Sequence, residues 1–438
     1  MLTTPISQRT AYCTLHWAEQ GRGPIWYNIQ RTSTVVREDG STVVSITYLR
    51  CTEQDHPRPL ISTLCGSDAN HILEFRPDGY TLHSYQQSTL TIPNNCSYEN
   101  FVLYKAPLLR YVYIEQNLIL TLIHIANCSL FSVPKTIRNV PHLETLIITS
   151  CRIQHLDLSD MMHLTSLHVV DLTHNQIVSI VVELPSGVVL PVQRLYLVGN
   201  RLRHLSVSVL HALQELRCVV LNGNRLEEIP SPLTLPMVEE LSIRHNRLRT
   251  LNCTDWHMPK LKYFFCNNNQ LTFAPVGWQT MWRIDKLDLS FNRLRHFRMD
   301  DIYLTQLRIL NLAANELTSV TTNQTHLRIP LERLQLADNR LTVLDISRWD
   351  MPNLWEFDVN RNQLTELGDV FLRFPSLDNM MKLRSNMPGF SVSLSPTVAC
   401  LKSAYSSSSS ESLGRLVKDF TFSADSLNFY NMGGKPND

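Results

Sequence analysis

Two cysteines, an aspartate and a histidine lie close together in the stretch NCTDWHMPKLKYFFCNNNQL, residues 252–271. Cys253, Asp255, His257 and Cys266 are all residue types that coordinate zinc when their side chains converge. Whether these four converge depends on the elements that carry them. The stretch therefore has to be interpreted within the organisation of the whole chain.

A repeat of the form LxxLxLxxNxL organises the middle of the chain, for example VQRLYLVGNRL and IDKLDLSFNRL. Eleven copies in one phase begin at residues 120, 143, 167, 192, 216, 238, 261, 284, 307, 331 and 354. The ninth position is Asn in all but the first two copies, which carry Cys128 and Cys151. Eleven copies in one phase predict a repeat architecture. We interpret the two cysteines as small buried substitutes for Asn rather than as a disulfide or metal ligands.

Each copy predicts one short strand and one turn of a solenoid. Strand positions alternate inward and outward, and strands of successive copies would stack in parallel about 4.8 Å apart. The apolar columns would share one core, and the ninth-position Asn would bond backbone groups where the strand turns away. We therefore predict an α/β solenoid. It is a curved horseshoe with a parallel β-sheet on the concave face and irregular or short helical segments on the convex face.

The alignment of the repeats changes the interpretation of residues 252–271 as a zinc site. LNCTDWHMPKL matches LDISRWDMPNL of a later copy without a gap, which places Cys253 in an apolar column. Cys266 occupies position 6, where most copies have Leu or Ile, whereas Asp255 and His257 fall in columns that vary freely. We interpret both cysteines as core residues and predict no metal site.

The repeat resembles that of the extracellular leucine-rich repeat family. On this basis we divide the chain into a cysteine-containing N-terminal cap over 1–100, the repeat array over 101–387 and a Ser-rich, poorly ordered tail over 388–438. The array holds the eleven clear copies and a degenerate twelfth. The cap would cover the open end of the core. Within it, TSTVVREDGSTVVSITYLRC predicts a β-hairpin turning at Asp39-Gly40.

The cysteines outside the repeat core bear on the compartment. Cys13, Cys51, Cys65 and Cys96 are disulfide candidates in the cap, and two bridges among them allow three connectivities. The alternative is four reduced cysteines in a cytosolic protein. Cys218, at position 3 of its copy, is expected on the concave face as an accessible thiol if reduced. Neither Cys218 nor Cys400 in the tail has an assigned role.

The net charge and the targeting signals indicate which classes of partner and which cellular location to expect. The formal net charge is +1, with 40 basic and 39 acidic side chains, which favours neither nucleic acid nor a membrane surface. The most apolar stretch, from Leu108, carries too many polar residues to span a bilayer, so we expect no membrane span. Four Asn-x-Ser/Thr sequons, at Asn95, Asn127, Asn252 and Asn323, favour an extracellular glycoprotein. The expected signal peptide is absent from this sequence, and a cytoplasmic protein is the alternative.

No nucleophile elbow, zinc-protease helix or P-loop is present in the sequence, so we predict a non-enzymatic protein without a cofactor. Solenoids of this kind present their concave face to partners. Aromatic and charged residues gather at outward positions of the middle copies, a composition typical of protein interfaces. The predicted partner-binding residues are Arg194, Tyr196, Ser242, Arg244, His245, Tyr263, Phe265, Asp288 and Phe291.

Arginine recurs at the tenth position of the repeat, often with a second arginine two residues later. The tenth-position arginines are Arg152, Arg201, Arg225, Arg247, Arg293 and Arg340, and the second ones are Arg203, Arg249 and Arg295. They would line one lateral edge. We interpret this edge as a solvated surface, with binding of an acidic glycan or protein as the alternative.

The Met-Pro pairs Met258-Pro259 and Met351-Pro352, each followed by x-Leu, resemble a feature of insect (mosquito) leucine-rich immune proteins, here of the coil-less type. This resemblance implies a secreted protein of innate immunity, which would bind a pathogen surface molecule or hold a complement-like factor. A truncated Toll or adhesion-type receptor ectodomain and an intracellular scaffold are the alternatives. The oligomeric state is left open.

Overall fold

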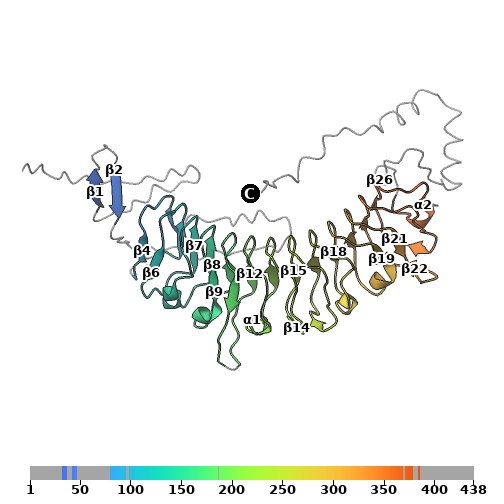
Figure 1. Ribbon diagram of the computed structural model, residues 1–438. Coiled ribbons are helices and arrows are strands. Elements are labelled where there is room, and N and C mark those ends of the chain that lie inside the picture. The colour runs from blue at the N-terminus through green and yellow to red at the C-terminus, as the bar shows by residue number, and fades with distance from the viewer. Residues whose placement is uncertain are drawn as a thin grey trace, which may run out of the picture.

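The computed structural model describes residues 32–36, 42–46, 79–94, 98–185, 187–367, 370–377 and 383–384. From residue 79 onward these residues form a curved solenoid, with the strands labelled β7, β8, β12, β15 and β18 along its concave side (Figure 1). The convex side carries short strands and short helical turns such as α1 (Val207–His211). The predicted fold class is confirmed.

The concave face is one sheet of fourteen strands in which all neighbours are parallel. The strands are β3 (Gly79–Leu82), β5 (Asn100–Leu103), β7 (Leu122–Ala126), β8 (Thr145–Thr149), β10 (Val169–Asp171), β12 (Arg194–Tyr196), β13 (Cys218–Val220), β15 (Glu240–Ser242), β17 (Tyr263–Phe265), β18 (Lys286–Asp288), β20 (Ile309–Asn311), β23 (Arg333–Gln335), β25 (Glu356–Asp358) and β26 (Leu383–Arg384). The register never slips, since Leu241 pairs with Phe264 and Phe264 with Leu287. Each column of the repeat therefore becomes a row across the sheet.

The sheet extends further toward the N-terminus than the predicted array boundary at residue 101. Strand β3 and the first residue of β5 precede that boundary, and β5 pairs in parallel with β7. The turn after β5 has Ala106 at the ninth position, where its backbone bridges to Cys128. Because this position is not Asn, the repeat pattern in the sequence did not identify this turn. At the other end, β26 lies within the degenerate twelfth copy.

The convex side is held by pairs of short parallel strands and by single helical turns. The strand pairs are β4 (Thr89–Ile92) with β6 (Tyr111–Ile114), β9 (His155–Asp157) with β11 (Ser179–Val181), β14 (Leu233–Thr234) with β16 (Trp256–His257), β19 (His296–Arg298) with β21 (Ser319–Thr321), and β22 (Leu327–Arg328) with β24 (Trp349–Asp350). The helical turns are η1 (Lys135–Asn139), η2 (Leu158–Met161), η3 (Trp278–Thr280), η4 (Met299–Ile302), α1 and α2 (Val370–Arg373). Among the described residues, none of the helices is long and apolar enough to cross a membrane.

One continuous core fills the space between the sheet and the convex segments. Its rows are the inward columns of the repeat, as in Leu287, Leu310 and Leu334, each fully buried. Trp278 and Trp349 from convex turns close the same core. Because each turn buries its apolar side chains against its neighbours, a single turn could not close this core alone.

The ninth-position asparagines form the predicted hydrogen-bond ladder. In the central turn, Asn269 Nδ2 donates to the carbonyls of Ile243 and Cys266, at 3.0 Å each. Its Oδ1 accepts from the backbone N–H of Leu248 at 3.1 Å. The same three bonds recur at Asn175, Asn200, Asn224, Asn246, Asn292, Asn315, Asn339 and Asn362. The ladder ties each turn to the one before it.

The interpretation of Cys128 and Cys151 as unbonded ladder substitutes is wrong, because the two form a disulfide. Parallel stacking in register brings the ninth positions of consecutive turns together, and the two Cα atoms are 4.6 Å apart. That separation falls within the range a disulfide spans. Both side chains are nearly buried, so the bridge takes the place of two ladder rungs at the N-terminal end.

The predicted hairpin is confirmed, since β1 (Thr32–Val36) pairs antiparallel with β2 (Thr42–Ile46). The cap cysteines Cys13, Cys51, Cys65 and Cys96 lie outside the described residues, as do Cys400 and the Ser-rich tail.

Candidate partner-binding site

The four residues of the opening stretch do not converge. Cys253 and Cys266 are fully buried in the core, whereas Asp255 and His257 are exposed. Among the described residues no group of three or more His, Cys, Asp or Glu side chains could hold a metal ion. Burial raises the pKa of both thiols well above the usual range of cysteine. These cysteines serve packing, as the repeat register predicted.

The buried thiols give a direct test of this packing. Because only the thiolate is alkylated, we expect Cys253 and Cys266 to react with iodoacetamide at least about a hundredfold more slowly in the native protein than in denaturant. Mass spectrometry of the alkylated peptides measures both rates at neutral pH. Fast native alkylation of either residue would contradict the buried position.

The centre of the concave face holds an aromatic and cationic cluster around Phe265. The Arg244 guanidinium lies 4.2 Å from the centre of the Phe265 ring and the Lys286 ammonium 5.3 Å from it. Tyr263 stacks nearly parallel to the same ring, with 6.5 Å between ring centres. These contacts are cation–π and stacking geometries. Adjacent strands thus bring together side chains about 23 residues apart in sequence.

The expectation that Phe265 is an exposed anchor is wrong, since only 1% of it is accessible. Long side chains on strands less than 5 Å away cover the ring. Tyr263 and Arg244, in contrast, are partly exposed. A partner at this place would meet Tyr263, Arg244 and Lys286, while Phe265 supports them from beneath.

A second concave cluster, around Cys218, lies on β10, β12 and β13. Val169, Tyr196, Cys218 and Val220 pack together on the sheet face opposite the main core. Cys218 is 1% exposed, so the expectation of an accessible thiol is wrong. Arg194, in register with Cys218, is half-buried. Predicted site residues Arg194 and Tyr196 therefore belong to this cluster rather than to the one around Phe265.

Buried polar groups link the two clusters. Glu240, in register with both Cys218 and Tyr263, is 3% exposed, and desolvation raises the pKa of its carboxyl. The charge of Arg244 and a hydrogen bond with Cys218 oppose that rise. Ser242 is also buried, and its hydroxyl donates to Asn222 Oδ1 at 2.8 Å. Ser242 therefore supports the sheet surface and is not itself available to a partner.

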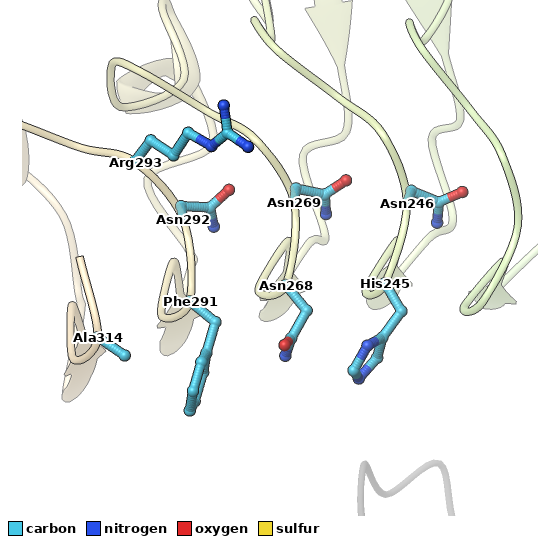
Figure 2. Close-up of a pocket in the computed structure, with 8 residues that line it drawn as sticks. All are labelled: His245, Asn246, Asn268, Asn269, Phe291, Asn292, Arg293 and Ala314. Atoms are coloured by element: carbon cyan, nitrogen blue, oxygen red, sulfur yellow. The ribbon is translucent and has the colours of Figure 1, made fainter. Parts of the chain in front are cut away.

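The remaining predicted residues lie at the rim of the concave face. The eighth residue of most turns adopts a left-handed backbone, with φ of 52° for both His245 and Phe291 and 56° for Asn268. This conformation turns the chain out of the strand and aims the side chains along the rim. In Figure 2, His245, Asn268 and Phe291 project side by side from three successive turns.

These rim side chains border a shallow, widely open hollow of about 600 Å³, and the ladder residues Asn246, Asn269 and Asn292 also line it. Phe291 borders this hollow and is 59% exposed. The Asp288 carboxylate accepts hydrogen bonds from the backbone N–H and the hydroxyl of Ser290.

Sequence reasoning missed Lys286, Glu240, Asn268 and Arg293 as members of these surfaces. All four occupy positions 3, 8 or 10 of their copies, so the column assignment alone could have included them. What the sequence lacked was the contact of Lys286 with Phe265 and the shared hollow of Asn268 and Arg293.

Near the N-terminal end of the array, strand β7 carries the partly buried His124. Burial lowers the pKa of its imidazole from 6.5 to about 4, and Tyr104 packs edge-on against the ring. Because the folded-state pKa is depressed, the full contribution to stability is present above pH 6.5. It is lost as the pH falls from 6.5 toward 4.

Lowering the pH from 8 to 5 should therefore remove about 2 kcal/mol of unfolding free energy through His124. His124→Phe should reduce this loss, because the ring is kept and the titrating group removed. The exposed His142 provides the control, since His142→Phe should leave the pH dependence unchanged. Urea denaturation at both pH values measures the effect, and an unchanged loss in His124→Phe would contradict it.

The predicted glycosylation sites differ in their surroundings. Asn127, Asn252 and Asn323 are exposed, and Asn95 lies outside the described residues. Asn252 Oδ1 accepts from the hydroxyl of Thr254 at 2.7 Å, within the sequon itself. At Asn127 the sequon hydroxyl of Ser129 instead donates to the carbonyl of Pro107 at 2.6 Å. Use of these sites stays a prediction.

The geometry defines a parallel-strand solenoid with exposed side chains along the rim of its concave face. No protein-family model matches the chain. Podocan-like protein 1 of Mus musculus is 26% identical over 279 residues, which cover 56% of this chain and 49% of that protein. The transforming growth factor beta activator LRRC33 of Danio rerio is 32% identical over 179 residues, covering 38% and 24% respectively. The solved leucine-rich repeat domain of APL1B has a TM-score of 0.48 at 17% identity, covering 67% of this chain and 81% of that one.

The chain spans about half of the mouse relative and about a quarter of the Danio rerio relative. The eleven in-phase repeats and the parallel sheet make the chain a leucine-rich repeat solenoid.

Proposed function

We propose that this chain is a secreted, non-enzymatic protein that binds a protein partner through its concave face and rim. The observation that carries the proposal is the open hollow beside exposed Phe291, next to the cluster of Arg244, Tyr263 and Lys286. An exposed aromatic side chain flanked by cations is the composition of an interface anchor. The relative in Danio rerio is named as an activator of transforming growth factor beta, an action on another protein.

Extracellular location is part of the proposal. The Cys128–Cys151 disulfide supports it, because such bridges persist in oxidising compartments. The exposed sequons at Asn127, Asn252 and Asn323 are compatible with it. The Met-Pro pairs that resemble insect immune proteins extend the proposal to innate immunity, with a pathogen surface molecule or a complement-like factor as partner.

Secretion is tested by expressing the chain with an added signal peptide and mapping glycans and disulfides by mass spectrometry. We expect glycans on at least one sequon, an intact Cys128–Cys151 bridge, and bridges among Cys13, Cys51, Cys65 and Cys96. Free thiols at all four cap cysteines in the secreted protein would contradict the proposal and favour an intracellular scaffold.

Partner binding is tested by incubating the tagged full chain with extracellular proteins of the source organism. The complexes are cross-linked, and the captured partner is identified by mass spectrometry. Against the captured partner, the double variant Tyr263→Ala, Phe291→Ala should bind at least about tenfold more weakly. Phe273→Ala is the matched control, because Phe273 is 66% exposed but does not border the hollow. Equal affinities of the double variant and the control, with unchanged circular dichroism, would rule out this surface.

A further inference from the structure

The arginine edge, formed by the residues at positions 10 and 12 of the repeat, carries guanidinium groups that the proposed binding at the concave face does not use. Backbone hydrogen bonds fix it in place, because each tenth-position N–H donates to a carbonyl of the turn before it. Arg225 N–H bonds the carbonyl of Leu202 at 2.8 Å, and Arg247 N–H bonds that of Leu226 at 2.9 Å. The eleventh side chain points into the core, so positions 10 and 12 face solvent. The guanidinium groups therefore project from a rigid backbone in neighbouring turns.

From Arg152 to Arg293 the tenth position contains only hydrogen-bond donors that are cationic or amide groups. Its residues are Arg152, Gln176, Arg201, Arg225, Arg247, Gln270 and Arg293. Seven turns spaced about 4.8 Å apart make an edge about 30 Å long. Arg203, Arg249 and Arg295 widen it from position 12, where Glu227 is the one carboxylate in these turns.

The central arginines of this edge are not neutralised by neighbours. Arg201, Arg225 and Arg247 are exposed, and none forms an ion pair with a carboxylate among the described residues. Further along, Arg295 and Arg340 share Glu316, at 3.9 and 3.5 Å. A strip of positive charge thus persists on a chain whose net charge is only +1.

The edge meets the hollow at Arg293, whereas Arg201, Arg225 and Arg247 do not line it. In Figure 2 the Arg293 side chain lies on the other side of the row Asn246, Asn269 and Asn292 from His245, Asn268 and Phe291. Positions 10 and 12 from Arg201 to Arg249 carry no aromatic side chain on which a nucleic-acid base could stack. They also lack the apolar anchors of a protein interface. What remains is a row of guanidinium forks suited to sulfate and carboxylate oxygens.

We propose that this arginine edge binds a linear sulfated glycan, laid across successive turns with its sulfate groups on Arg201, Arg225 and Arg247. Glutamine amides at Gln176 and Gln270 continue the row of donors. The binding is electrostatic and falls as salt rises, since exposed charges are screened. It requires no protein partner and leaves the concave face free.

The test uses the folded full chain and heparin immobilised on a sensor surface. At about 0.15 M salt the triple variant Arg201→Ala, Arg225→Ala, Arg247→Ala should bind at least about tenfold more weakly than the native chain. The control is Arg138→Ala, Arg298→Ala, Arg348→Ala, which removes the same charge from exposed convex positions and should keep native affinity. Desulfated heparin should lose binding to the native chain.

Three outcomes would overturn the proposal. They are no binding of the native chain to heparin, equal losses in the two triple variants, and equal binding of single-stranded DNA or polyglutamate. The last would make the edge a general polyanion surface. The protein-binding proposal stays testable in each case, because Tyr263 and Phe291 are intact in these variants.

Discussion

Replacing Asn269 by alanine should lower the free energy of unfolding by about 3–4 kcal/mol, because its side chain makes three hydrogen bonds that join two successive turns. Its amide bonds the carbonyls of Ile243 and Cys266, and its oxygen accepts from the backbone of Leu248. Ile243 and Cys266 keep a second donor each, from Asn246 and Asn292. The N–H of Leu248 loses its bond while buried among core residues, which accounts for a large share of the cost.

Urea denaturation followed by circular dichroism measures this loss. The control is Asn252→Ala, since Asn252 is exposed and its side chain accepts only from Thr254. It should change the unfolding free energy by less than about 0.5 kcal/mol when the protein is made without glycans. If both variants unfold at the same urea concentration, the ladder does not stabilise the array as described.

Removing the disulfide should cost about 3 kcal/mol at the N-terminal end of the array, as expected for a bridge closing a loop of this length. Cys128 and Cys151 are 23 residues apart, and the variant is Cys128→Ala, Cys151→Ala. The physical reason is that the bridge restricts the unfolded chain, while alanine supplies no bond in its place. Thermal unfolding with and without a reductant measures the loss, and the alanine variant should not respond to the reductant.

A second variant separates the bridge from the ladder position it occupies. Cys128→Asn, Cys151→Asn introduces the residue type that the nine later clear copies carry there. It should recover at least about half of the lost stability through side-chain bonds to the backbone. If the asparagine variant is no more stable than the alanine variant, these two turns do not have the backbone geometry of the others.

Much of the fold could be predicted from local periodicity. The alternation that buries Leu287 and leaves Lys286 and Asp288 partly exposed recurs in Leu310 and its neighbours, because a strand residue faces one side or the other of the sheet. The same register removed the apparent zinc site. It placed Cys253 and Cys266 in apolar columns without any knowledge of their neighbours in space.

The candidate site was predictable only in part. The sequence placed Tyr263, Phe265, Arg244 and Phe291 on one surface, but exposure there depends on side chains from adjacent turns. Phe265 is covered by its neighbours, whereas Phe291, carried out of the strand by a left-handed residue conformation, stands free at the rim. The position of each residue in the repeat predicts only that its side chain points away from the core. It could not predict that Phe265 is buried and Phe291 exposed.

The sequence by itself determined the repeat, its register, the shared core and the asparagine ladder, because these follow from spacing along one strand and one turn. Only the tertiary structure decided the Cys128–Cys151 bridge, the burial of Cys218 and Phe265, and the hollow beside Phe291. Each of these depends on the distance between side chains of neighbouring turns. That distance results from the stacking of the turns and cannot be predicted from the sequence of a single turn.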